Sequence, residues 1–199
     1  MPKPFPDLSY ESRHGNVQKG PICGVDEAGR GPLCGPVVAA AVILDQSQIP
    51  EGLNDSKVLS APAREHLLNA LLPNAKIGIG ISEPEEIDRI NILWASMAAM
   101  RRAVENLEIQ PFSALIDGNR VPDGLKCEAH AIVKGDSKSL SIAAASIVAK
   151  VTRDRLMKQA DMRFTGYNLS QHQGYPTKAH RAAVQKLGKS PIHRWSFGK

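Results

Sequence analysis

The feature that most constrains this chain is a pair of adjacent carboxylates, Asp26 and Glu27, which follow the apolar residues 22–25. Adjacent carboxylates repel each other, so the end of a strand gains nothing from them without a cation. Divalent cations such as Mg²⁺ and Mn²⁺ prefer the oxygen ligands that carboxylates supply. The chain then enters the loop Ala-Gly-Arg-Gly-Pro, whose glycines permit a close approach of the backbone to a ligand. The pair therefore predicts a metal site beside a substrate loop, with an exposed acidic turn as the alternative.

The composition is that of an ordinary globular protein. The chain has 199 residues, 42% of them hydrophobic and 23% charged, which is enough for one domain with a substantial core. Its three cysteines lack Cys-x-x-Cys spacing, which argues against a disulfide framework and a structural zinc site. The longest apolar run, residues 37–44, is shorter than the roughly 20 residues that a membrane-spanning helix needs. We therefore expect a cytoplasmic protein without a membrane segment and, because no apolar stripe is left unexplained, a monomer.

Basic residues gather near the C-terminus. The whole chain has 25 lysines and arginines against 20 aspartates and glutamates, yet no acidic residue follows Asp161. The basic residues after that point are Arg163, Lys178, Arg181, Lys186, Lys189, Arg194 and Lys199. A basic segment joined to a body with an acidic site suits a polyanion whose phosphates meet the basic part. A solvated surface face would have the same composition and stays open as the alternative.

The apolar pattern predicts one α/β domain with a basic extension. Residues 1–20 are polar and contain prolines, so we expect a poorly ordered extension there. Residues 21–163 alternate between short apolar runs, expected as strands of a mixed central sheet, and amphipathic segments, expected as flanking helices. Residues 164–199 form a basic segment, in which we expect a helix packed on the domain. The expected strands are residues 22–25, 37–44, 75–81, 111–116 and 129–133.

Acidic residues recur where these elements end. Asp26 and Glu27 end the first strand, Asp117 ends a later one, and Asp136 precedes a long helix expected over about 139–162. Successive side chains of a strand point to opposite faces, so a site that uses both Asp26 and Glu27 must lie where the chain leaves the sheet. Asp136 near a helix N-terminus is favourably placed as an anion. If the strands are neighbours, the four carboxylates converge at one edge of the sheet.

Six segments together resemble the bacterial ribonuclease HII family, the type 2 ribonucleases H. They are residues 24–33, 53–57, 115–119, 133–137, 141–150 and 171–177. They follow one another in the order and at the spacings typical of that family, over about 22–197. The resemblance implies a ribonuclease H-like mixed sheet flanked by helices, with a short C-terminal helical segment. It also implies an endonuclease that hydrolyses the RNA strand of RNA–DNA hybrids and nicks duplex DNA on the 5′ side of single ribonucleotides.

The resemblance assigns roles to the four acidic residues, Asp26, Glu27, Asp117 and Asp136. In the family they hold two divalent ions, Mn²⁺ or Mg²⁺, and the reaction leaves 5′-phosphate and 3′-hydroxyl ends. We expect Asp26, the most central of the four, to bridge both ions, and Asp117 to be a further ligand. Glu27 and Asp136 are either ligands or residues that position water.

A second set of residues is expected to read the sugar. Only the 2′-hydroxyl distinguishes ribose from deoxyribose. In the family, the backbone of a Gly-Arg-Gly loop and a tyrosine grip that hydroxyl. The corresponding residues here are Gly29, Arg30, Gly31 and Tyr175.

Several polar residues are expected to contact phosphates of the nucleic acid. They are Asn54, Ser56, Lys57, Ser146 and Lys150, of which the last two lie one helical turn apart and share a face. Three histidines, His172, His180 and His193, match no zinc spacing, and we expect them to be surface or loop residues.

Two other functions remain open at this point. One is a different nuclease of the ribonuclease H fold, such as a junction resolvase or ribonuclease HIII, with the same carboxylate cluster. The other is a protein that binds RNA–DNA hybrids without cutting them. Such a protein is expected to lose one or more of the four acidic residues, whereas this chain has all four.

Overall fold

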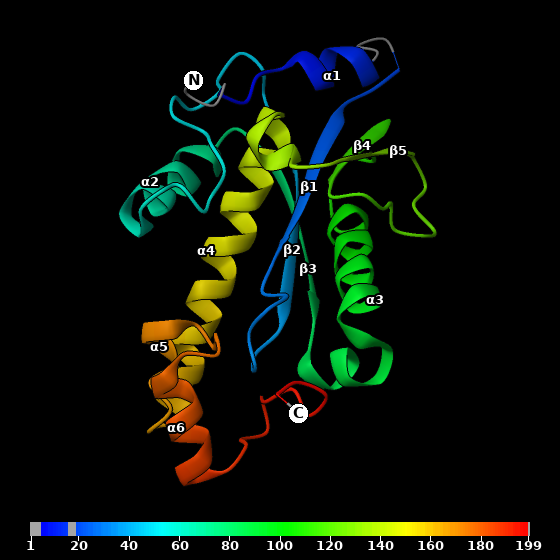
Figure 1. Ribbon diagram of the computed structural model, residues 1–199. Coiled ribbons are helices and arrows are strands. Elements are labelled where there is room, and N and C mark those ends of the chain that lie inside the picture. Colours follow the sequence, from blue (N-terminus) through cyan, green and yellow to red (C-terminus); the bar gives the residue numbers. More distant parts are fainter. Residues whose placement is uncertain (1–4, 16–18, 199) are drawn as a thin grey trace.

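The computed structural model describes residues 5–15 and 19–198, and its centre is a five-stranded mixed sheet (Figure 1). The strands are β1 (Ile22–Ala28), β2 (Val37–Ile43), β3 (Lys76–Ser82), β4 (Ser113–Asp117) and β5 (Glu128–Ile132). Their order across the sheet is β3-β2-β1-β4-β5. β2 is antiparallel to both of its neighbours, whereas β1, β4 and β5 run parallel. The expected mixed α/β sheet is confirmed.

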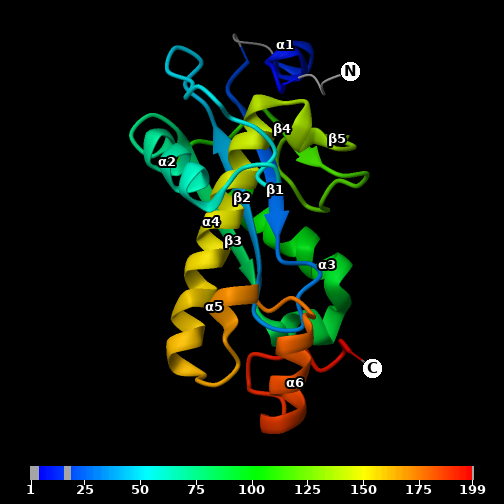
Figure 2. The same ribbon diagram turned by 60° about the vertical axis from the view of Figure 1, so that its left-hand side comes forward.

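Helices cover both faces of the sheet, as Figures 1 and 2 show. α3 (Pro84–Glu105) packs on one face, and α2 (Ala61–Leu71) and α4 (Leu140–Arg163) pack on the other. β2 is buried throughout. Its alternate residues divide between the two layers, because Ala39 and Ala41 belong to the core under α3 whereas Ala40 and Val42 face α4. This burial on both faces explains why β2 reads as a continuous apolar run.

A close contact between β1 and α4 places the start of that helix over the sheet. A Cβ atom at Gly24 would overlap the backbone of Ser141 and Ile142, so only glycine fits there. α4 begins with Ser139 as its N-cap, whose hydroxyl accepts a hydrogen bond from the Ile142 N–H. A short 3₁₀ turn, η1 (Gly135–Ser137), comes just before this cap. The sheet, η1 and the start of α4 therefore meet at one place.

The N-terminal segment differs from the poorly ordered extension that we expected over 1–20. Its described part includes α1 (Ser9–His14), in which the Glu11 side chain is buried. Glu11 Oε1 accepts hydrogen bonds from Ser139 Oγ at 2.6 Å and from the Ser141 N–H at 2.9 Å. A carboxylate at this position complements the N-terminal dipole of α4, which explains why α1 is fixed there. Residues 1–4 and 16–18 lie outside the described residues.

The basic C-terminal segment folds against the far end of α4. It contains α5 (Leu169–His172) and α6 (Lys178–Leu187), which lie at the lower end of the molecule in both ribbon views (Figures 1 and 2). The chain after α6 returns to the loop between β1 and β2, where the Arg194 N–H donates to the Leu33 carbonyl at 2.9 Å. Asp88 of α3 accepts hydrogen bonds from the Trp195 and Ser196 N–H groups. Within the described ranges, no helix is both long and apolar enough to cross a membrane.

Candidate active site

Three of the four predicted acidic residues come together at one end of the sheet. Asp26 lies in β1, Asp117 ends the parallel neighbour β4, and Asp136 lies in η1. One carboxylate oxygen from each lies within 4.8 Å of the other two, and we call these three residues the acidic cluster. Asp26 and Asp136 are buried, with 4% and 5% of their surface exposed. The convergence follows from the parallel pairing of β1 with β4, which places their C-terminal ends side by side.

Glu27 lies beside the acidic cluster and outside it. Its backbone N–H donates to Asp26 Oδ1 at 2.7 Å, and its Oε1 lies 3.4 Å from Arg30 Nη1. Its Oε2 is buried and has no hydrogen-bond partner among the described residues. Burial raises the pKa of Glu27, the charge of Arg30 opposes that effect, and the charge of Asp117 adds to it. An orphaned carboxylate oxygen next to three further carboxylates is an arrangement that suits a cation.

The electrostatics of the acidic cluster also favour the binding of a cation. Burial raises the pKa of Asp26 well above its usual range, and the charges of Glu27 and Asp117 raise it further. Burial and the charge of Asp136 raise the pKa of Asp117, although the Gly135 N–H donates to Asp117 Oδ1 at 2.7 Å. Crowded carboxylates of this kind become favourable as anions when a divalent cation binds between them. The donor set, the burial and the crowding all fit Mg²⁺ or Mn²⁺.

Lys57 is the one residue of the expected phosphate contacts that touches the acidic cluster. Its Nζ lies 2.7 Å from Asp136 Oδ2 and 3.7 Å from Asp55 Oδ1. Partial burial alone would lower the pKa of Lys57, but the hydrogen bond to Asp136 and the charge of Asp26 raise it overall. A charged ammonium group therefore stands at the rim of the cluster.

The other expected phosphate contacts are placed less directly. Ser56 and Ser146 are buried and bonded to each other, since the Ser56 N–H donates to Ser146 Oγ at 3.2 Å. Their contact fixes the loop that carries Lys57 onto α4, so the structure gives both serines a supporting position. Asn54 accepts from the Asp55 N–H, and Lys150 pairs with Asp154 at 2.7 Å. Contacts of these residues with nucleic acid remain predictions.

The expected sugar-reading residues lie in two loops that touch. We call residues 29–35 the glycine loop and residues 172–175 the tyrosine turn. The Leu33 N–H donates to the Gly174 carbonyl at 2.8 Å, and a Cβ at Gly31 would lie 3.6 Å from Tyr175 Cε1. Gly29 has φ +102° and no room for a Cβ, which would meet the Arg153 side chain and the Pro36 carbonyl. The sequence therefore has glycine where the structure requires it.

Two of the histidines differ from the surface positions that we expected. His180 and His193 are buried, and their Nε2 atoms lie 3.2 Å apart. Cys34 Sγ lies 3.8 Å from His180 Nε2, and His172 stacks on His180 with ring centroids 4.4 Å apart. The sequence spacing of these residues gave no signal, because the folding of the C-terminal segment back onto residues 33–35 brings them together.

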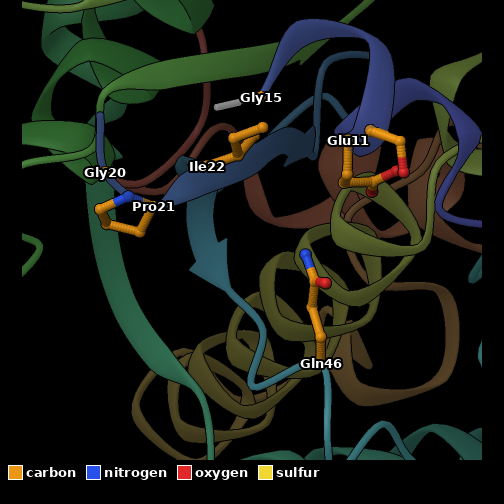
Figure 3. A pocket seen from close by; sticks show the side chains of 7 residues that line it. Glu11, Gly15, Gly20, Pro21, Ile22 and Gln46 are labelled. Carbon is orange, nitrogen blue, oxygen red and sulfur yellow. The ribbon is translucent and has the colours of Figure 1, made fainter. Parts of the chain in front are cut away.

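A cavity of about 520 Å³ lies under α1, apart from the predicted site residues (Figure 3). Glu11, Pro21, Ile22 and Gln46 are among its lining residues.

Comparison with known sequences identifies the family. The model of the ribonuclease HII family matches residues 23–199. Ribonuclease HII of Maricaulis maris is 59% identical over 176 residues, which cover 88% of this chain and 81% of that protein. Ribonuclease HII of Sinorhizobium medicae is 54% identical over 194 residues, which cover 98% of this chain and 90% of that protein.

Solved structures agree with this result. The ribonuclease H2 of Pyrococcus horikoshii superposes with a TM-score of 0.72 at 30% identity, covering 87% of this chain and 92% of that one. Ribonuclease HII of Archaeoglobus fulgidus, solved in a complex with PCNA, gives a TM-score of 0.77 at 25% identity, covering 90% and 96%. The chain therefore belongs to the ribonuclease HII family and is an endoribonuclease.

Proposed function

We propose that this enzyme cleaves the RNA strand of RNA–DNA hybrids and nicks duplex DNA on the 5′ side of a single embedded ribonucleotide. The products would carry 5′-phosphate and 3′-hydroxyl ends. One observation carries the proposal: the acidic cluster lies near the end of β1, and the glycine loop that follows β1 is hydrogen-bonded to the tyrosine turn. A site for cutting phosphodiesters and a surface for reading ribose are thus adjacent in the chain.

The acidic residues would hold two divalent ions, Mg²⁺ or Mn²⁺. Asp26, Asp117 and Asp136 offer oxygens within 4.8 Å of one another, and Glu27 adds a buried oxygen without a partner. A Bst ribonuclease HIII has been solved with Mn²⁺, and at 20% identity and a TM-score of 0.67 it shares the fold. Such ions would lower the pKa of the attacking water and neutralise the charge on the leaving 3′-oxygen.

The residues of the chain itself orient and balance this site. The Gly135 N–H fixes the Asp117 carboxylate, and the N–H of Glu27 fixes that of Asp26. Lys57 balances Asp136 in the free enzyme and places a positive charge where phosphates would approach. Burial of Asp26 and Asp136 limits the access of water, so charges in the site interact strongly.

Ribose would be read by backbone atoms and a tyrosine. The backbone of Gly29, Arg30 and Gly31 offers hydrogen-bonding groups that can approach a 2′-hydroxyl closely, because the glycines carry no Cβ. Tyr175 is 42% exposed and presents a hydroxyl and a flat ring beside Gly31.

The proposal is tested with an end-labelled DNA duplex that contains one ribonucleotide, incubated with Mg²⁺, Mn²⁺ or EDTA. We expect a metal-dependent nick on the 5′ side of the ribonucleotide, mapped on a sequencing gel, and no product in EDTA. A duplex with a stretch of RNA serves as the comparison. Cutting of long RNA stretches alone would contradict the junction assignment, and binding without cutting would contradict catalysis.

A further inference from the structure

The glycine loop is held from within the protein by one buried side chain, Arg194. The Arg194 guanidinium uses all five of its N–H donors on backbone carbonyls of residues 29–35. Nη2 donates to Gly29 at 2.6 Å and to Gly35 at 2.8 Å, and Nε donates to Gly35 at 3.0 Å. Nη1 donates to Arg30 at 3.0 Å and to Pro32 at 2.8 Å. The side chain thus determines the path of the loop that precedes and follows Gly31.

This arrangement carries a large desolvation cost. Arg194 is fully buried and makes no ion pair with a carboxylate within the described part of the chain. Burial, together with the nearby charge of Arg153, lowers the pKa of Arg194 to about 9. A buried charge is tolerated only when its hydrogen bonds are well formed, and the planar guanidinium fork is what matches several carbonyls at once. A lysine at this position would keep the charge and lose the fork.

The neighbouring residue, His193, supports the tyrosine turn through a hydrogen-bond relay. The Ser190 N–H donates to His193 Nδ1 at 2.9 Å, so the proton of the neutral His193 ring is on Nε2. That Nε2 donates to His180 Nε2 at 3.2 Å. His180 Nδ1 carries the other proton and donates to the Tyr175 carbonyl at 3.0 Å. The relay therefore ends on the backbone of Tyr175.

The same proton positions argue against a metal site at Cys34, His180 and His193, although one ligand atom from each lies within 4.8 Å of the others. His193 Nε2 holds a proton as long as the Ser190 N–H occupies Nδ1, so it has no lone pair for a metal. Burial raises the pKa of the Cys34 thiol to about 11 in the metal-free protein. The group is a satisfied hydrogen-bond network.

A second buried arginine joins the two loops directly. Arg153 Nη2 donates to the Cys34 carbonyl at 3.2 Å, and Nη1 donates to the Gln173 carbonyl at 3.0 Å. The glycine loop and the tyrosine turn are therefore fixed to each other and to the dipeptide of His193 and Arg194.

We propose that His180 and Arg194 are positioning residues that set the separation between the Gly29–Arg30–Gly31 backbone and Tyr175, and through it the preference of the enzyme for ribose. This inference rests on the proposed function of those four residues. Neither His180 nor Arg194 is expected to touch the nucleic acid. They act through carbonyls, which have to be placed to a fraction of an ångström to hold a ligand in a productive geometry.

The first test compares Arg194→Lys with the control Arg155→Lys. Arg155 lies on α4 in an exposed ion pair with Glu65, away from both loops. Fluorescence anisotropy in EDTA, which prevents cutting, gives the dissociation constants of two duplexes that differ by one 2′-hydroxyl. Their ratio is the ribose preference of the protein alone. We expect Arg194→Lys to reduce this preference about tenfold and Arg155→Lys to leave it unchanged.

A second pair of variants remains informative if Arg194→Lys does not fold. An asparagine at position 180 places its amide nitrogen near the position of histidine Nδ1 and can still donate to the Tyr175 carbonyl. A glutamine places its amide near Nε2 instead, and the donor to Tyr175 is lost. We expect His180→Gln to weaken the ribose preference and His180→Asn to retain most of it, with thermal unfolding measured for both.

The possible outcomes separate this inference from the proposed function. Loss of preference in Arg194→Lys or in His180→Gln, while the matched variants keep it, supports the inference. Equal preference in all variants, or no preference in the wild-type protein in EDTA, overturns it. The proposed function is decided independently, by whether the wild-type protein nicks the ribonucleotide-containing duplex with Mg²⁺ or Mn²⁺.

Discussion

The acidic cluster and the glycine loop both begin at the end of β1, but they are built in opposite ways. The acidic cluster presents side chains, and their crowding and burial raise the pKa of Asp26 and of Asp117. The glycine loop presents backbone atoms, and the buried cations Arg153 and Arg194 hold its carbonyls. In the first region carboxylates are crowded against one another, whereas in the second region buried guanidinium groups donate hydrogen bonds to backbone carbonyls. The difference suggests that cutting and reading can be altered separately.

Asp26→Asn is expected to have the largest effect. Loss of the central carboxylate should reduce cleavage by at least about 1,000-fold, or about 4 kcal/mol of transition-state stabilisation. The free protein should gain thermal stability in EDTA, because one member of a crowded group of carboxylates becomes neutral. Cleavage assays and thermal unfolding measure the two effects, with the exposed Asp123→Asn as the control. Wild-type turnover by Asp26→Asn would remove the acidic cluster from the mechanism.

Tyr175→Phe should weaken the preference for ribose and leave the general affinity for duplexes intact. The variant loses one hydroxyl and keeps the ring beside Gly31. We expect the preference for a duplex with one ribonucleotide to fall by up to about tenfold, because one hydrogen bond contributes up to about 1.5 kcal/mol. Competition binding against the all-DNA duplex measures the change. Equal losses on both duplexes would show that Tyr175 contributes to affinity without reading the sugar.

Glu11→Gln tests whether α1 stabilises the start of α4, which lies next to the acidic cluster. The substitution keeps an oxygen near Ser139 and Ser141 but removes the charge at the N-terminus of α4. We expect a loss of about 1 kcal/mol in unfolding free energy, equivalent to about 2–4 °C in Tm. The exposed Glu51→Gln is the matched control. An unchanged Tm in Glu11→Gln would mean that α1 does not stabilise the start of α4.

We expect a small effect of pH on the free energy of unfolding, which arises from His193 in the C-terminal segment. Burial, with the nearby charge of His180, lowers the pKa of His193 to about 4. An unfolded chain binds this proton near pH 6.5, so the stability contributed by neutral His193 is complete above that pH and is lost as the pH falls towards 4. Between pH 7 and pH 6 the loss should be about 0.7 kcal/mol. His193→Gln should flatten this part of the stability curve, and parallel curves would contradict the shifted pKa.

The acidic residues could be predicted from the sequence because each one ends an apolar segment. Asp26 and Asp117 follow runs of buried residues inside β1 and β4, and Asp136 precedes the cap of α4. The parallel pairing of β1 with β4, which brings them together, could not be predicted from the spacing. Glu27 was expected at the same site, and the alternation along β1 places it beside the cluster.

The buried side chains that hold the glycine loop could not be predicted from the sequence. Arg194 was counted among basic residues expected to meet phosphates, yet it is buried, because its partners are carbonyls that every residue possesses. Arginine is rarely buried without a partner, so its burial cannot be anticipated from composition. The same holds for His180 and His193, whose contacts form only when the C-terminal segment folds over residues 33–35.

The separation of cutting from reading is tested most directly with Asp26→Asn. The binding of this variant to two duplexes that differ by one 2′-hydroxyl is measured by anisotropy in EDTA, beside the wild-type protein. The account predicts that Asp26→Asn, although unable to cut, keeps the wild-type preference within about twofold, or about 0.4 kcal/mol. If Asp26→Asn loses both cleavage and the preference for ribose, the account is contradicted, because the acidic cluster would then also distinguish the sugars.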